Sequence, residues 1–137
     1  MQTIAEVMTP DVEVVRPEET LRDAARAMAD LDVGSLPVCD GRKLVGVITD
    51  RDIAVRAVAE GKSVDTPVSE VMTDEVVWCT DTDSIDDVLQ QMSDAQVRRI
   101  PVVDRNRQLV GIVALGDIAL EEDEDVDETL RDISMPS

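Results

Sequence analysis

The chain has no histidine, phenylalanine or tyrosine, one tryptophan and two cysteines. Without histidine it lacks the side chain that most often serves as general acid or base, and the commonest nitrogen ligand of metals. Cys39 and Cys79 are too few for a disulfide framework or a four-cysteine zinc site, so we expect them to be buried as small apolar residues in a reducing compartment. The core must therefore be filled mainly by valine, isoleucine, leucine, methionine and alanine.

Other signals are missing as well. The first eight residues carry Glu6 and have neither a basic nor an apolar stretch, and no apolar run reaches the length that crosses a bilayer. The sequence contains no glycine-rich phosphate loop, no metal-ligand cluster and no nucleophile with a base partner. We therefore expect a cytoplasmic protein that is not an enzyme, needs no cofactor and has no membrane partner.

Positive charge is scarce relative to negative charge, and the formal net charge is −18. Such a surface repels the phosphate backbone of nucleic acids and the anionic face of membranes, so nucleic acid is an unlikely partner. An anionic ligand would need a local group of arginine or lysine side chains, which makes the positions of the basic residues informative.

An internal repeat organises the chain. Glu6-Val7-Met8-Thr9 recurs as Glu70-Val71-Met72-Thr73, and Pro37-Val38 recurs in the same register as Pro101-Val102. After one extra residue in the second copy, Asp52-Ile53-Ala54 matches Asp117-Ile118-Ala119. Two copies in one register, with a single gap, indicate duplication of one structural unit.

Each copy predicts the order β-α-β-β-α. Thr20 and Ser84 each precede apolar residues at helical spacing and have an acid three residues later, which predicts capped helices. A second helix is expected to open near Asp52 in the first copy, with a stop at Gly61, and near Asp117 in the second. Strands are expected over Val12–Val15, Ser35–Cys39 and Leu44–Ile48, and over Val76–Cys79, Ile100–Val103 and Leu109–Val113.

The predicted fold class is α+β, with two β-α-β-β-α repeats over residues 1–62 and 63–120. One copy of about 50 residues would be marginally stable alone, so the copies are expected to pair. Residues 121–137 form an acidic tail, which we interpret as a solvated helix end or a frayed tail rather than a calcium loop.

In these residues the chain resembles the CBS-domain pair, named after cystathionine β-synthase, and especially the short bacterial CBS-only proteins of the hypoxic response protein type. The resemblance covers about residues 4–120. It rests on the two Val-Met-Thr segments, on Ser35-Leu36-Pro37-Val38 and Arg99-Ile100-Pro101-Val102, and most specifically on Gly46-Val47-Ile48-Thr49-Asp50-Arg51-Asp52.

The resemblance implies repeats related by a pseudo-two-fold axis, with clefts between them that bind AMP, ADP, ATP or S-adenosylmethionine as a regulatory ligand. It also implies a homodimer, a role in signal transduction and an unidentified protein that the module regulates. The alternative is a protein-interaction or dimerisation module whose clefts are vestigial.

The resemblance implies that Asp52 and Thr49 are the sugar-binding pair of the first site. A carboxylate accepts both ribose hydroxyl protons, and a helix start adds N–H groups that favour phosphate. The alternative for Asp52 is an ordinary helix cap, and the two roles are compatible. In the second copy Asp117 is the candidate ligand residue, with a helix cap as the alternative, but Thr49 is matched by Ala114, so a hydroxyl is lost there.

The resemblance implies that Arg98 and Arg99 are candidate phosphate ligands, because an arginine just before this strand often meets ligand phosphate in the family and an arginine fork suits phosphate. The first copy has Gly34 and Ser35 at these positions. The alternative is a surface pair that offsets neighbouring acids. We expect Arg98 to serve a phosphate whose ribose lies on Asp52.

The adenine base would need an apolar slot. Val12, Pro37, Val76 and Pro101 are the candidates, and ordinary core packing is the alternative for each. Trp78 could stack on the base, although a lone tryptophan in a strand more often fills a core or an interface.

Overall fold

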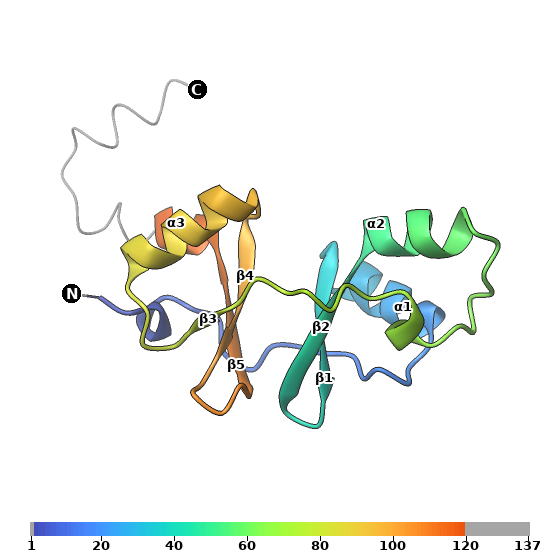
Figure 1. The fold of residues 1–137 in the computed structure, drawn as a ribbon, viewed down its shortest axis with the longest axis horizontal. Helices are drawn as coiled ribbons and strands as arrows, with labels where there is room; N and C mark the ends of the chain where they lie inside the picture. The colour runs from blue at the N-terminus through green and yellow to red at the C-terminus, as the bar shows by residue number, and fades with distance from the viewer. Residues whose placement is uncertain (1, 120–137) are drawn as a thin grey trace, which may run out of the picture. The chain divides into compact units, whose positions relative to one another are not determined.

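A computed structural model describes residues 2–119, so the predicted acidic tail lies outside the described residues (Figure 1). The described chain divides into two compact units. The first-repeat unit comprises residues 12–76 and 106–109, and the second-repeat unit comprises residues 2–11, 77–105 and 110–119. Each unit is described separately below.

Both units mix helices with a small sheet, which confirms the α+β class. The elements of the first-repeat unit are α1 (Leu21–Leu31), β1 (Ser35–Asp40), β2 (Lys43–Thr49), α2 (Asp50–Asp52), the π-helix η2 (Ile53–Val58) and the 3-10 turn η3 (Val68–Glu70). Those of the second-repeat unit are the 3-10 turn η1 (Ile4–Glu6), β3 (Cys79–Thr80), α3 (Ile85–Ala95), β4 (Arg99–Val103), β5 (Leu109–Ala114) and helical residues 115–119.

The predicted helix caps are confirmed. The Asp23 N–H donates to Thr20 Oγ1 at 3.1 Å, and the Thr20 N–H donates to Asp23 Oδ2 at 3.2 Å. Ser84 likewise accepts the N–H of Asp87 at 3.1 Å. Capping side chains of this kind satisfy N–H groups that the first turn leaves without partners, so these two helices begin where the sequence predicts.

The predicted hairpin of the first repeat is also present. β1 and β2 pair antiparallel, from Ser35 opposite Thr49 to Asp40 opposite Lys43, and Gly41 takes φ +65° in the turn. In Figure 1, α1 and the helix that continues from α2 lie on the same face of this hairpin. Leucine, valine, isoleucine, alanine and methionine side chains fill the core between them.

The strand expected over Val12–Val15 is wrong in extent, because only Val15 pairs, in an isolated parallel bridge with Val38. The Val15 N–H donates to the Pro37 carbonyl, and the Cys39 N–H donates to the Val15 carbonyl, both at 3.0 Å. Pro37 has no N–H to continue the ladder towards Glu13. Pro101 has the same place in the second repeat, where β3 begins only at Cys79 and pairs with Val102.

Each compact unit contains the Met-Thr segment that belongs to the other repeat in the sequence. The first Met-Thr segment, residues 2–9, packs in the second-repeat unit, where Ile4 is fully buried and Thr9 pairs with Ile112. The second Met-Thr segment, residues 64–73, packs in the first-repeat unit, where Thr73 pairs with Val47. Each unit is therefore completed by the segment that precedes the other repeat in sequence.

Two glycines allow these segments to lie close to the sheets. A Cβ at Gly46 would lie 2.8 Å from Met72 Sδ and 2.9 Å from the Thr73 carbonyl oxygen. A Cβ at Gly111 would lie 2.7 Å from Met8 Sδ and 2.8 Å from the Thr9 carbonyl oxygen. Since the carbonyls belong to paired backbone, any side chain at these positions would push the Met-Thr segment off the strand.

The cysteines are buried and unpaired, as expected. Burial raises the pKa of the Cys39 thiol from its usual value near 9 to about 11. Burial, together with the nearby carboxylates of Asp83 and Asp81, raises the pKa of Cys79 to about 12. Both thiols are protonated at neutral pH and pack as apolar groups. No helix within residues 2–119 is long and apolar enough to span a bilayer.

These thiols predict a loss of stability in alkali. The folded pKa values are raised, so their contribution is complete below about pH 9, where unfolded thiols are protonated, and is lost as the pH rises through about 11 to 12. The free energy of unfolding, measured with urea at several pH values, should fall over this range. The chain has no tyrosine, so no phenol ionises over the same range.

The repeat supplies the control for this measurement, because Val103 and Val15 occupy the positions equivalent to Cys39 and Cys79. A variant with both cysteines changed to valine should have a flatter stability profile between about pH 9 and pH 11. An unchanged profile would show that the thiols do not cause the loss.

Candidate functional site

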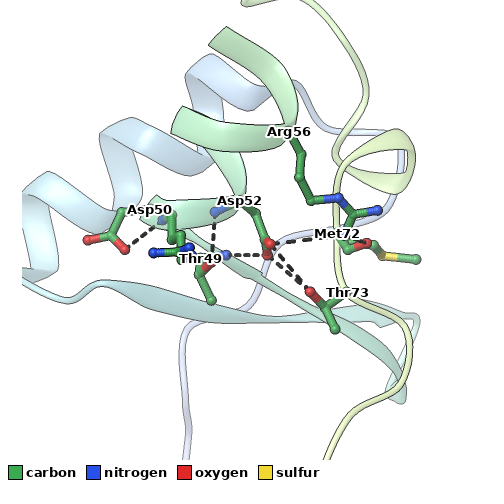
Figure 2. A network of polar contacts seen from close by, with 7 residues as sticks. Thr49, Asp50, Asp52, Arg56, Met72 and Thr73 are labelled. Atoms are coloured by element: carbon green, nitrogen blue, oxygen red, sulfur yellow. Dashed lines mark hydrogen bonds and ion pairs between the residues drawn. The ribbon is translucent and has the colours of Figure 1, made fainter. Parts of the chain in front are cut away.

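The candidate site lies where β2 turns into α2. The Asp52 N–H donates to Thr49 Oγ1 at 2.9 Å, and the Thr49 N–H donates to Asp52 Oδ2 at 3.1 Å (Figure 2). These two bonds form a capping box in which Thr49 is the cap and Asp52 is the third helical residue. The expectation that this helix opens near Asp52 is therefore corrected, because it begins at Asp50.

Two further side chains reach the Asp52 carboxylate. The Thr73 hydroxyl lies 3.4 Å from Oδ1 and 3.3 Å from Oδ2, so its proton is shared between the two oxygens. Arg56, one turn further along the helix, places Nη1 4.0 Å from Oδ1 and donates from the same nitrogen to the Met72 carbonyl at 3.2 Å. Figure 2 shows Thr73 and Arg56 approaching the carboxylate from outside the capping box.

Asp52 is unusual in its burial. Its exposed fraction is 9%, and it is the buried charged side chain among the residues that the structure describes. A buried carboxylate is costly unless it is paired and hydrogen-bonded, and here an N–H, a hydroxyl and a nearby guanidinium meet that need. These contacts therefore hold the Asp52 carboxylate in one orientation.

The second repeat has a poorer version of this arrangement. Residues 115–119 are helical, so the expected start near Asp117 is corrected in the same way as that near Asp52. The Ala114 N–H donates to Asp117 Oδ2 at 3.3 Å, but alanine offers no hydroxyl to complete the box. Within the described chain Thr9, the counterpart of Thr73, is not bonded to Asp117.

The sequence adds a third difference between the repeats. Arg56 aligns with Glu121, which lies outside the described residues, so the cation beside Asp52 is matched by an acid. The two carboxylates therefore differ in hydroxyl partner, and the two repeats differ in the charge of the aligned residue in the sequence.

The arginines expected to bind phosphate lie in the second-repeat unit. Arg99 begins β4 and Arg98 precedes it, and both are exposed. The Arg98 carbonyl accepts the N–H of Leu115 at 2.8 Å, and neither guanidinium pairs with an acid within the described chain. That Arg98 and Asp52 serve one ligand stays a prediction.

The apolar candidates divide between the two units. In the first-repeat unit Val12 and Val76 are half-buried and Pro37 is buried, whereas Pro101 is buried in the second-repeat unit. Thr49 and Asp52 are in direct contact, and Val12, Pro37 and Val76 share their unit. A role in holding a base remains a prediction for all four apolar residues.

Sequence reasoning missed Thr73 and Arg56. Thr73 could have been found through the repeated Val-Met-Thr motif, but its contact with Asp52 spans 21 residues and depends on where the second Met-Thr segment packs. Arg56 lies four residues after Asp52, the spacing at which opposite charges meet on a helix. That signal was available in the sequence.

Known proteins match this chain in two segments that correspond to the two repeats. The family model of the CBS domain matches residues 4–58 and again residues 68–124. The chain belongs to the CBS-domain family. It is 45% identical over 122 residues to the CBS domain-containing protein YhcV of Bacillus subtilis, covering 89% of this chain and 86% of that protein. It is 40% identical over 121 residues to hypoxic response protein 1 of Mycobacterium tuberculosis, covering 87% and 84% respectively.

Solved CBS structures match the fold. The crystal structure of Hypoxic Response Protein I with two coordinated zinc ions matches at a TM-score of 0.81 and 38% identity, covering 88% of this CBS pair and 99% of that chain. CBSX2 in complex with AMP matches at 0.81 and 28%, covering 90% and 98%. The CBS pair of MJ0100, solved with 5′-methylthioadenosine and S-adenosylmethionine, matches at 0.78 and 28%, covering 92% and 99%.

The zinc ions of the first structure have no counterpart cluster in the described part of this CBS pair. Residues 2–119 contain no group of three or more histidine, cysteine, aspartate or glutamate side chains arranged to hold a metal ion. The chemistry that this site can offer is hydrogen bonding by a fixed carboxylate and a hydroxyl.

The capping box predicts a measurable difference between the repeats. Thr49→Ala should lower the free energy of unfolding by roughly 1 kcal/mol, because it removes the acceptor for the Asp52 N–H. Ala114→Thr should raise it by up to about 1 kcal/mol, because it supplies that acceptor in the second repeat. Urea unfolding monitored by circular dichroism measures both changes.

Thr49→Ser and Ala114→Val are the matched controls for these variants. The serine keeps the hydroxyl and should retain most of the stability, whereas the valine adds similar bulk to threonine without an acceptor. If Ala114→Val stabilised the chain as much as Ala114→Thr, packing rather than capping would be the cause.

Proposed function

We propose that this CBS pair is a regulatory module that binds an adenosyl ligand, with Asp52 and Thr49 holding the ribose. The observation that carries the proposal is the buried, fixed Asp52 carboxylate beside the Thr49 hydroxyl. AMP in one structural neighbour, and methylthioadenosine and S-adenosylmethionine in another, share an adenosine group, which supports that class of ligand. Ligand binding would act through a protein that the module regulates, rather than through catalysis.

The charge of the chain bears on which adenosyl ligand is bound. A net charge of −18 disfavours a polyphosphate more than a ligand with a cationic group such as the sulfonium of S-adenosylmethionine. Arg98 and Arg99 are the proposed local positive charges that would bind a phosphate in spite of this net charge. Added salt should therefore improve binding of ATP and weaken any attraction for the sulfonium.

A second function is favoured by a specific observation. The second repeat lacks the hydroxyl at Ala114 and has Glu121 in place of Arg56, so its candidate site has lost two of the partners that surround Asp52. A module with vestigial sites would act by protein interaction alone. Under the ligand proposal, the same losses mean that Asp52 marks the working site and Asp117 does not.

Thermal unfolding in the presence of AMP, ADP, ATP or S-adenosylmethionine tests the ligand proposal. A ligand at about 100 times its dissociation constant adds roughly 2.7 kcal/mol, which raises the melting temperature by several degrees for a chain of this size. The shift should be lost in Asp52→Asn, which keeps the size of the side chain but removes its charge, and kept in Asp117→Asn. No shift with any of the four would favour the interaction module.

We also infer a homodimer, which the family resemblance implies. In the first-repeat unit an apolar groove of about 310 Å³ lies between α1 and η2, with Arg22, Arg26 and Lys62 among its lining residues. Val58 lines the groove and is 68% exposed, which is costly for a large apolar side chain in a monomer. A second copy covering this face would remove that area from water.

Sedimentation equilibrium measures the assembly. Val58→Lys should weaken the dimer at least about tenfold, because a charge would be buried in the contact. Val55→Lys is the matched control: Val55 is 49% exposed on the same helix but does not line the groove. If Val58→Lys and Val55→Lys weakened the dimer equally, the groove would not be the dimer contact.

A further inference from the structure

The Thr73 hydroxyl contacts the Asp52 carboxylate from a distant part of the sequence. It comes from the second Met-Thr segment, 21 residues from Asp52, and reaches both carboxylate oxygens. The backbone of Thr73 is fixed independently, because Thr73 and Val47 exchange two N–H to carbonyl bonds of 2.9 Å. The hydroxyl therefore contacts the carboxylate from a residue that does not belong to the capping box and whose backbone is held by its own two hydrogen bonds.

The hydrogen-bonding capacity of the carboxylate leaves room for a ligand. A carboxylate offers about four acceptor positions. The Thr49 N–H uses one, and the shared Thr73 proton uses at most one more. About two positions remain, which is the number that the two hydroxyl groups of a ribose require. Thr73 is thus able to orient Asp52 without closing it to a diol.

Arg56 strengthens the link to the same segment. Its guanidinium lies 4.0 Å from Asp52 Oδ1 and donates to the carbonyl of Met72, the neighbour of Thr73. Two side chains outside the capping box therefore contact the carboxylate, and both involve the second Met-Thr segment. Thr73 belongs to that segment, and Arg56 is bonded to the Met72 carbonyl. Gly46 makes this approach possible by leaving the space that Met72 and the Thr73 carbonyl occupy.

The second repeat provides an internal comparison. Thr9 pairs with Ile112 as Thr73 pairs with Val47, and Gly111 gives the same close approach, but Thr9 and Asp117 are not bonded within the described chain. The backbone arrangement alone therefore does not produce the side-chain contact. The contact is a particular property of the Asp52 site.

We propose that Thr73 is a positioning residue for ligand binding: its hydroxyl holds the Asp52 carboxylate in the orientation that receives a ribose diol, and so couples that site to the segment joining the two repeats. The proposal rests on the proposed adenosyl-binding function. Thr73 acts through Asp52 and is not itself a ligand to the sugar.

Isothermal titration with AMP and S-adenosylmethionine tests this role, using Thr73→Val, which keeps the shape of threonine without its hydroxyl. Loss of one hydrogen bond to a charged group should weaken binding roughly tenfold. Thr73→Ser should retain near-normal affinity, and Thr9→Val, the equivalent change in the first Met-Thr segment, should have no effect. Melting temperatures of the unliganded variants check that each one is folded.

Deoxy-AMP analogues separate positioning from a general structural effect. If Thr73 orients the carboxylate towards the diol, Thr73→Val should weaken AMP much more than 2′-deoxy-AMP or 3′-deoxy-AMP, so that discrimination by the ribose hydroxyls falls. A structural defect would instead weaken all of these ligands equally, which would overturn the proposal.

The remaining outcomes distinguish the two proposals. If the unaltered chain binds AMP or S-adenosylmethionine and Asp52→Asn loses that binding while Thr73→Val keeps it, the adenosyl function stands and the role of Thr73 is refuted. If the unaltered chain binds neither probe, the adenosyl function fails for both ligands, and the inference about Thr73 fails with it.

Discussion

The close passage of each Met-Thr segment over a glycine is the constraint on which each unit depends. At Gly46 and Gly111 the neighbouring carbonyl oxygen lies only 2.9 and 2.8 Å from where a Cβ would be, so the segment lies against its strand with no side chain between them. This contact closes cores that contain no phenylalanine or tyrosine and that rely on dense packing of small aliphatic side chains. It also brings Thr73 to the end of β2, where the candidate site lies.

Burial of Asp52 follows from that arrangement. The buried carboxylate has the polar partners that burial requires, because the Thr49 N–H, the Thr73 hydroxyl and the Arg56 guanidinium surround it. Capping and ligand binding are not competing interpretations here, since the cap fixes one face of the carboxylate and leaves acceptor capacity on another. A helix start thus supplies both stability and a preset polar group.

Local patterns predicted the parts of the fold that depend on neighbouring residues. The caps at Thr20 and Ser84 and the hairpin around Gly41 are confirmed, because bonds within a few residues determine them. The strand over Val12–Val15 failed because its partner is distant and contains Pro37, which cannot donate. The helix expected to open near Asp52 begins at Asp50, with Thr49 as its cap and Asp52 as its third residue. An acid at the third helical position and an acid at the cap look alike in sequence, so the sequence did not give the first helical residue.

What remained beyond prediction was the exchange of the Met-Thr segments, since the motif recurs in both repeats and does not say which unit each copy completes. The Thr73–Asp52 contact follows from that exchange and could not be inferred without it. The duplication then makes the asymmetry interpretable: with the same backbone pairing in both units, Ala114 removes a hydroxyl and Glu121 replaces a cation. The second helix nevertheless begins at the position equivalent to Asp50 with half of the cap, so the full set of partners at Asp52 is not needed to start a helix there. Those additional partners fix the orientation of the Asp52 carboxylate, which is what the proposed ligand site would require.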